Sequence, residues 1–397
     1  MRLGLSILTA AALLLAACDA SSDSPGASSP SESGPAPAPP TPRYIDAGRP
    51  DLLSDWGQLA AGGGVLVLGA GVTPYDLNTA LFSDYALKLR TVWTPEGAGP
   101  AVYDEREAFA FPVGAVITKT FYYPRAGGVD AVSADGVAMQ HFDGRALDLT
   151  SVRLIETRVL VRREAGWEAL PYVWNEDQSE ARLARAGAFV DLTLVSDAQG
   201  ARPLDYLVPD VNQCANCHVT DTSDGRGLRP IGPKARHLNG PFDYADGTDN
   251  QIARWSATGL LAGAPAPEAA PATPAWSGDI PASLAALDAA ARGYIDVNCA
   301  HCHSRTGQAD TSGLYLEPWE PVSANFGVCK PPIAAGRGTG NRLYGIVPGD
   351  ADASIFVHRM ESDRPDIMMP ELGRAVAHEE GVALVAAWID AMAGGCG

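Results

Sequence analysis

The sequence predicts a multidomain protein in which a mostly antiparallel β domain is followed by α-helical domains. Residues 43–210 contain no cysteine and include β-branched and aromatic segments bounded by turn residues, which is typical of strands. Residues 283–294 and 378–392 instead repeat apolar residues at a spacing of about 3.6, which is typical of helices. All cysteines except Cys18 lie after residue 210.

The N-terminus predicts export and lipid attachment. Residues 1–17 form a signal peptide, with Arg2 ahead of an apolar run that ends at small residues. Leu15-Ala16-Ala17-Cys18 resembles a bacterial lipobox, so Cys18 would carry the lipid; an ordinary signal peptide with an incidental cysteine is the alternative. Residues 18–42, rich in Ser, Pro and Gly, predict a lipidated disordered tether. We therefore expect a protein of the bacterial cell envelope, in the periplasmic space and anchored to the inner or outer membrane.

The charge balance narrows the choice of partners. The chain has 29 Lys and Arg against 47 Asp and Glu, a net charge of −18, which becomes −19 when the leader with Arg2 is removed. This acidic excess argues against nucleic acid as a partner. It would steer encounters with a basic protein; an ordinary solvated acidic surface is the alternative.

Two segments of the β region, residues 152–163 and 167–174, predict a hairpin because both are β-branched and aromatic and Glu164-Ala165-Gly166 joins them. Residues 115–123 predict a further strand, and we expect an antiparallel sandwich. The run VLVLGAG at residues 65–71 imitates the start of a dinucleotide-binding motif, but Pro74 replaces the third glycine and no βαβ unit follows. We therefore exclude nicotinamide and flavin binding.

Two motifs, at residues 214–218 (CANCH) and 299–303 (CAHCH), have the spacing C-x-x-C-H. In this motif both thiols add to the vinyl groups of a haem, and the histidine becomes the proximal ligand of its iron. The sequence therefore predicts two covalently bound c-type haems. The thiols and histidines are Cys214, Cys217 and His218 for haem 1, and Cys299, Cys302 and His303 for haem 2.

Other uses of these motifs fit less well. A thioredoxin-like C-x-x-C needs a βαβ context, which the pattern lacks. A zinc site that pairs the two C-x-x-C units is conceivable, but they start 85 residues apart, at 214 and 299, whereas zinc ribbons separate them by about 15 to 20. Of the other cysteines, Cys329 and Cys396 remain after the lipid site, and we predict a disulfide between them because an exported protein keeps such bonds. Two free thiols are the alternative.

The C-terminal region predicts one helix capped by Ser283 that leads into the second motif and another over residues 378–392. This order resembles the class I cytochrome c fold, which implies a methionine ligand on a loop before the last helix. Met368-Met369-Pro370 lies there. We choose Met369 because Pro370 restricts the residue before it to extended backbone and because Met-Pro matches the family motif; core filling is the alternative for both methionines.

The sixth ligand of haem 1 stays open at this point. No methionine occurs between the two motifs, and His237 is the nearest candidate. Met139 and His141 are alternatives from the preceding region, and His301 is a poor choice inside the second motif. A vacant or water-bound iron is the remaining alternative, and such an iron can bind small molecules or catalyse.

These observations divide the chain into six parts. The predicted parts are a signal peptide at 1–17, a tether at 18–42, a β-rich domain at 43–210, a haem 1 segment at 211–262, a Pro/Ala-rich linker at 263–280 and a class I cytochrome c-like haem 2 domain at 281–397.

At the level of phrases the chain resembles a family of diheme c-type cytochromes in which a β-rich region precedes both haem motifs. The phrases span most of residues 50–397 and are TPYDLNTALFSDYALKLR, TKTFYYP, PYVWNEDQSEARL, VNQCANCH and VCKPPIAAGRGTG. Members resemble electron-transfer proteins and are similar in being encoded, in several bacteria, near a parallel β-helix protein. The resemblance extends to His218, His303 and Met369 at matching motifs.

Two functions are compatible with this pattern. The first is an electron carrier whose partners are redox proteins, such as a periplasmic dehydrogenase, another cytochrome or the co-encoded β-helix protein. The alternative is a haem enzyme, either a diheme peroxidase-like protein or the haem subunit of a dehydrogenase, that uses an open haem 1. Diheme peroxidases separate their motifs more widely and have catalytic residues that we do not find, so we expect a carrier rather than an enzyme.

Overall fold

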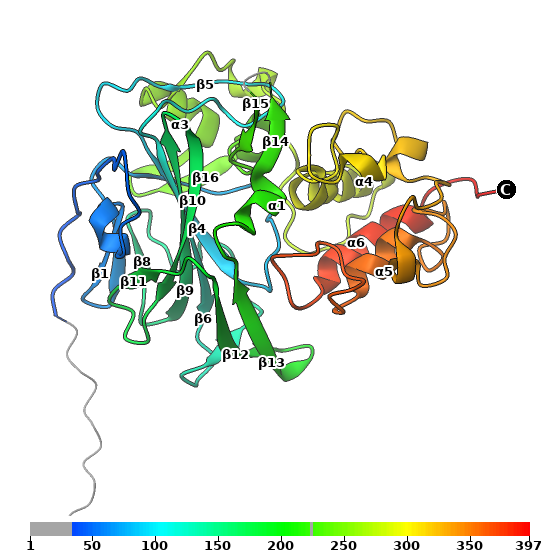
Figure 1. The fold of residues 1–397 in the computed structure, drawn as a ribbon, viewed down its shortest axis with the longest axis horizontal. Coiled ribbons are helices and arrows are strands. Elements are labelled where there is room, and N and C mark those ends of the chain that lie inside the picture. Colours follow the sequence, from blue (N-terminus) through cyan, green and yellow to red (C-terminus); the bar gives the residue numbers. More distant parts are fainter. Residues whose placement is uncertain (1–33, 223–224) are drawn as a thin grey trace, which may run out of the picture. The chain divides into compact units, whose positions relative to one another are not determined.

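The central element of the fold is a six-stranded antiparallel sheet with the order β11-β10-β9-β6-β4-β3. The computed structural model describes residues 34–222 and 225–397, and Gly34–Gly397 form one compact unit (Figure 1). The predicted signal peptide, Cys18 and most of the tether lie outside the described residues. The strands of the sheet are β3 Thr73–Tyr75, β4 Leu87–Trp93, β6 Val116–Pro124, β9 Val152–Arg163, β10 Gly166–Trp174 and β11 Ala181–Leu183.

The predicted hairpin is confirmed, because β9 and β10 pair from Arg163 and Gly166 onward. The strand predicted over residues 115–123 is β6. Smaller sheets flank this core. They are β1 Leu59–Gly62 with β2 Val65–Leu68 and β8 Ala146–Asp148; β7 Ala131–Ser133 with β12 Ala188–Ser196 and β13 Gly200–Val208; and the pairs β5 Ala101–Val102 with β18 Leu261–Ala262, β14 Val219–Thr222 with β15 Gly225–Leu228, and β16 Pro241–Tyr244 with β17 Gly247–Asn250.

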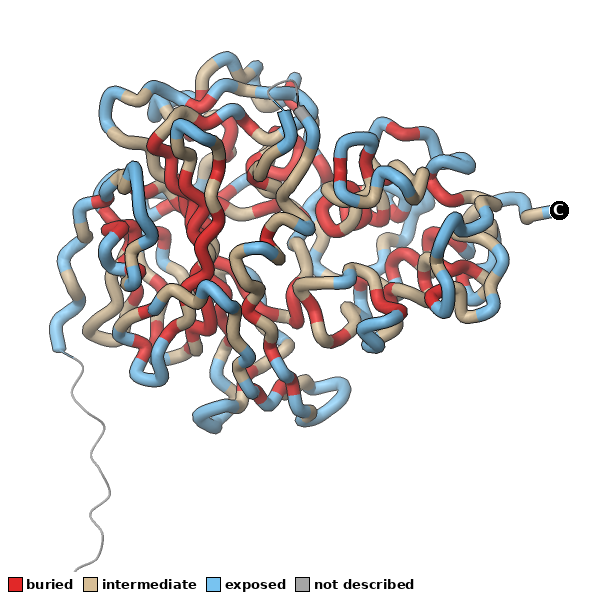
Figure 2. Tube along the Cα trace, viewed as in Figure 1, coloured by how far each residue is buried: buried red, intermediate tan, exposed pale blue. Residues whose placement is uncertain are grey.

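The two faces of the central sheet bury different kinds of side chain. Successive residues of a strand point to opposite faces, and buried positions follow the central strands (Figure 2). One face packs a continuous apolar core that includes Leu89, Val116 and Val159. The opposite face belongs to two separate cores, one around Ile117 and one around Phe121. Charged residues of β4, β6 and β9 lie between these two cores.

Six short α-helices occur among the described residues. They are α1 Cys214–His218, α2 Ala235–Leu238, α3 Gln251–Ala257, α4 Leu284–Ile295, α5 Ile355–Glu361 and α6 Glu379–Asp390. The predicted cap of α4 is confirmed, because the Ser283 side chain accepts a hydrogen bond from the Ala286 N–H. Helices α4, α5 and α6 share a core that includes Ile295, Leu384 and Trp388.

The predicted fold class, a β domain followed by α-helical cytochrome c-type haem domains, is wrong. The structure is mostly β, with 30% of residues in strands and 19% in short helices, and it does not form helical cytochrome c domains. Residues 211–262 contain the two hairpins β14–β15 and β16–β17, and the helices there, α1, α2 and α3, have only 5, 4 and 7 residues. Glycine and proline recur through residues 307–349 and interrupt helices, which leaves irregular chain and 3₁₀ turns between α4 and α5.

The segment between β3 and β4, residues 76–86, joins the sheet to the C-terminal region. The Asn298 side chain accepts a hydrogen bond from the Phe82 N–H at 2.8 Å. The Phe82 ring stacks on His378 with centroids 4.2 Å apart. Asp84 accepts hydrogen bonds from the N–H groups of Ala375 and Val376 at 2.6 and 2.9 Å. Together these contacts hold α4 and the start of α6 against the β region.

Candidate functional site

The first C-x-x-C-H motif forms α1, which packs on the face of the central sheet. Its Cys214 is buried in the same apolar core as Val92 and Ile117. After the motif, the β14–β15 hairpin returns the chain so that the His218 carbonyl accepts a hydrogen bond from the Arg229 N–H at 2.8 Å. The His218 Nδ1 atom lies 2.7 Å from the Arg229 carbonyl oxygen. This contact leaves Nε2 as the ring atom for a ligand bond.

The second motif follows α4 directly. A turn of π-helix, Asp296–Ala300, continues α4 into the motif, and the His303 N–H donates to the Cys299 carbonyl at 2.9 Å. His303 Nδ1 lies 3.2 Å from the Ser312 hydroxyl oxygen, so here too Nε2 is the ring atom left for a metal. Burial lowers the pKa values of His218 and His303 to about 4, and both rings are neutral, as a ligand must be.

The two motifs lie against each other. Ligand atoms of Cys217, His301 and Cys302 all fall within 4.8 Å of one another. The Cys302 thiol lies 3.4 Å from the Asn216 carbonyl oxygen. The chain segments after the motifs also meet, because the Asp221 N–H donates to the Thr306 carbonyl at 3.0 Å. Sequence reasoning missed this juxtaposition, since the spacing of two motifs along a chain says nothing of their distance in space.

The four motif thiols are free and differ in their surroundings. Burial raises the pKa of Cys299 to about 12 and also raises the pKa of Cys214. The hydrogen bond between Cys217 and Cys302 lowers the pKa of Cys217 and raises that of Cys302. Cys217 therefore forms a thiolate more readily than Cys302 does.

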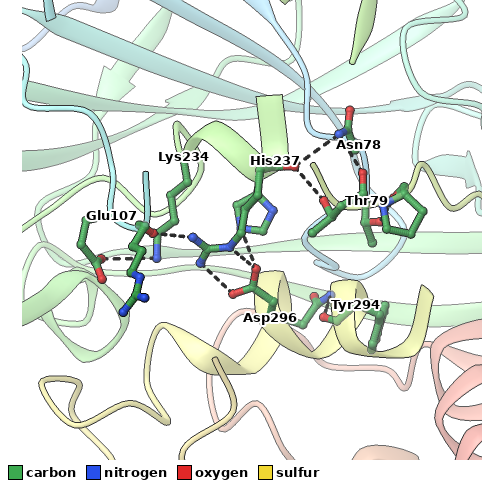
Figure 3. A network of polar contacts seen from close by, with 12 residues as sticks. Asn78, Thr79, Glu107, Lys234, His237, Tyr294 and Asp296 are labelled. Carbon is green, nitrogen blue, oxygen red and sulfur yellow. Dashed lines mark hydrogen bonds and ion pairs between the residues drawn. The ribbon is translucent and has the colours of Figure 1, made fainter. Parts of the chain in front are cut away.

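His237, the predicted sixth ligand of haem 1, is buried in a polar network beside α4 (Figure 3). Its Nε2 atom lies 3.4 Å from Asp296 Oδ2. Burial lowers the pKa of His237 to about 3, so the ring is neutral. Its Nδ1 atom is buried without a hydrogen-bond partner in the described part of the chain. The ligand role stays a prediction, and the contact with Asp296 argues against Nε2 being free for iron.

Met369, the predicted ligand of haem 2, lies on the loop between α5 and α6. Its N–H donates to the Arg359 carbonyl at 2.9 Å, and its carbonyl accepts from the Arg374 guanidinium at 2.9 and 3.2 Å. The neighbouring Met368 is buried, whereas Met369 is partly exposed. The Met369 backbone is held by hydrogen bonds at its N–H and its carbonyl, and its side chain lies outside the packed core. This arrangement is more typical of a ligand than of a core residue.

Cys329 and Cys396, the predicted disulfide pair, are joined by a disulfide with Cα atoms 5.3 Å apart. The bond fastens the C-terminal tail to the irregular region that precedes α5.

The donor set of each motif fits a covalently bound haem. Each supplies two free thiols and one neutral histidine whose Nδ1 is already engaged by an oxygen atom. A hydrogen bond on the second ring nitrogen is the usual way in which proteins orient a metal-binding histidine.

No family model, no curated protein and no solved structure matches this chain. Among residues 34–222 and 225–397, no helix is both long and apolar enough to cross a membrane.

Proposed function

We propose that this protein is a diheme c-type cytochrome that transfers electrons. Haem 1 would be attached to Cys214 and Cys217 with His218 on its iron, and haem 2 would be attached through the second motif. A haem held in this way supplies an iron that is reversibly oxidised and reduced. The chain supplies the attachment, the orientation of each histidine and the burial that tunes the iron.

The observation that carries this proposal is the contact between the two motifs, in which Cys217 and Cys302 are neighbours. Two cofactors attached at adjacent points suit the exchange of electrons. The two motifs meet because α1 lies on the sheet and α4 ends beside α1 (Figure 1). Each motif comes from a different part of the chain, so the pairing depends on the whole fold.

The ligand of haem 2 opposite His303 is, in this proposal, Met369. Thioether ligation raises the potential of a c-type haem. The two hydrogen-bonding arginines, Arg359 and Arg374, would hold the loop that presents it.

The partners and the location belong to the same proposal. An acidic protein with a net charge of −18 is suited to meet a basic redox protein. The expected partners are a dehydrogenase, another cytochrome or a β-helix protein of the periplasm. Lipid at Cys18 would keep the carrier at a membrane of the cell envelope.

A second candidate is a protein that holds a metal ion directly between Cys217, His301 and Cys302. The grouping of their ligand atoms within 4.8 Å favours it. Thiolate and imidazole ligands suit zinc or copper. In this case the thiols would not be bonded to haem.

A redox titration of protein matured in cells that attach c-type haems separates the two candidates. We expect the optical bands of c-type haem to titrate with two electrons per chain. The Cys217→Ser variant should lose one of these electrons, and Cys302→Ser should lose the other. Protein without haem bands, from which a chelator removes one metal ion per chain, would contradict the proposal.

A further inference from the structure

Three basic side chains lie side by side across the central sheet. Arg90 of β4 is the cross-strand partner of Lys119 of β6, and Lys119 is in turn the partner of Arg158 of β9. We call these three residues the basic row. Like charges directly opposite each other on neighbouring strands are destabilising. A row of three adjacent cations therefore destabilises the sheet unless another group compensates for their charge.

The basic row is only partly neutralised. Arg90 forms an ion pair with Asp76, and Arg158 donates to Glu156 at 2.5 and 2.8 Å. Lys119 forms no hydrogen bond or ion pair within the described ranges, and its Nζ atom lies 5.0 Å from the centre of the Phe121 ring. The Nη2 atom of Arg90 is buried without a partner there.

The positive charges of Arg90 and Lys119 are energetically costly to bury at these positions. Arg90 is 4% exposed. Burial, with Arg158 and Arg90 next to it, lowers the pKa of Lys119 to about 7. An anion beside Lys119 would relieve both the repulsion and the desolvation.

The basic row lies next to the first motif. Val92, Ile117 and Leu160 are each two residues from a member of the row, so they share its face of the sheet. These three apolar residues share a core with Cys214. Charge interactions of Lys119 with Cys217, and of Arg158 with Cys214, agree with this placement.

We propose that the basic row is an anion site that receives the propionate carboxylates of the haem attached at Cys214 and Cys217. This assignment rests on the proposed function. Guanidinium and ammonium groups bind carboxylates through strong, charge-assisted hydrogen bonds. The unpartnered Nη2 of Arg90 and the ammonium of Lys119 offer donors for this purpose.

The test is the reduction potential of each haem in the holoprotein. Loss of a cation near haem 1 favours its oxidised state, so Lys119→Met should lower the equilibrium constant for reduction in one of the two titration waves. We expect a change of about tenfold, which is about 59 mV for a one-electron couple. Lys119→Arg keeps the charge and should restore the wild-type potential.

Arg162→Met is the matched control. Arg162 lies on β9 four residues beyond Arg158, about 13 Å along the strand on the same face. Arg162 is half-buried, and its loss removes the same charge. It should shift neither wave by more than about twofold, because a separation of about 13 Å exceeds the Debye length. Equal shifts for Lys119→Met and Arg162→Met would overturn the assignment.

A dissolved anion is the other source of a carboxylate or phosphate group. Adding phosphate or citrate to the wild type should leave both potentials unchanged if propionates fill the site. A shift that needs the added anion and disappears in Lys119→Met would overturn the propionate assignment. Protein without haem would overturn the proposed function as well, whereas two haems with unshifted potentials in Lys119→Met would overturn this assignment alone.

Discussion

Arg236 and Asp296 form a buried ion pair in which Nε and Nη2 of the arginine lie 2.5 and 2.9 Å from the two carboxylate oxygens. Arg236 belongs to α2, in the segment after the first motif, and Asp296 stands three residues before Cys299 of the second. The ion pair therefore connects the chain around the two motifs. Burial alone would raise the pKa of Asp296, but the hydrogen bonds and the charge of Arg236 hold it below its usual value.

Breaking this ion pair should destabilise the fold strongly. Asp296→Ala leaves the Arg236 guanidinium buried without its counter-ion, and we expect the free energy of unfolding to fall by about 3 to 5 kcal/mol. The control is Asp221→Ala, which breaks the exposed pair with Arg226 and should cost less than about 1 kcal/mol. Denaturant unfolding of both variants measures the difference, and equal losses would contradict this role for Asp296.

Asp84 should make stability depend on pH. Burial raises the pKa of this carboxyl from 3.8 to about 6, although Val376 and Ala375 donate hydrogen bonds to it. Between about pH 4 and pH 6 the folded state keeps a proton that the unfolded state releases. The free energy of unfolding therefore falls as the pH rises through this window, by on the order of 3 kcal/mol, and stays lower above it.

Asp84→Asn isolates this effect, because the amide oxygen can still accept both hydrogen bonds. We expect the variant to be more stable than the wild type at pH 8 and of similar stability at pH 4. Melting temperatures of both proteins at the two pH values measure the change. A difference that is the same at pH 4 and pH 8 would show that the carboxyl does not titrate as described.

Variants of the two adjacent methionines should distinguish a role in iron ligation from a role in packing. Met369→Ala should remove the spectral signature of thioether ligation from haem 2. Met368→Ala empties a buried position, so it should keep that signature while lowering stability by about 2 to 5 kcal/mol. Absorption spectra and thermal unfolding of both variants test this pair, and loss of thioether ligation in Met368→Ala alone would reverse the assignment.

His237→Ala tests whether this histidine is a ligand of haem 1. Because its Nε2 faces Asp296, we expect the variant to keep the haem 1 spectrum and to lose stability. A change in haem 1 coordination in His237→Ala would instead show that the ring reaches the iron.

Local features of the fold could be predicted, whereas features that depend on register could not. The β-branched and aromatic residues over 152–163 predict β9 correctly, and Ser283 predicts the cap of α4, because both patterns depend on near neighbours. Helical domains were a wrong prediction because C-x-x-C-H specifies the attachment of a cofactor and not the fold around it. The basic row arises only when Arg90, Lys119 and Arg158 come together from three strands. No local pattern in the sequence indicates that alignment.

The most direct test of the central claim is the mass of the intact protein after denaturation, since covalent haem stays attached while bound metal ions leave. We expect the mass of the mature chain plus two haems, with peptides that place one at Cys214 and Cys217 and the other at Cys299 and Cys302. An unmodified chain with four free thiols at these positions, obtained from cells competent to attach c-type haem, would contradict it.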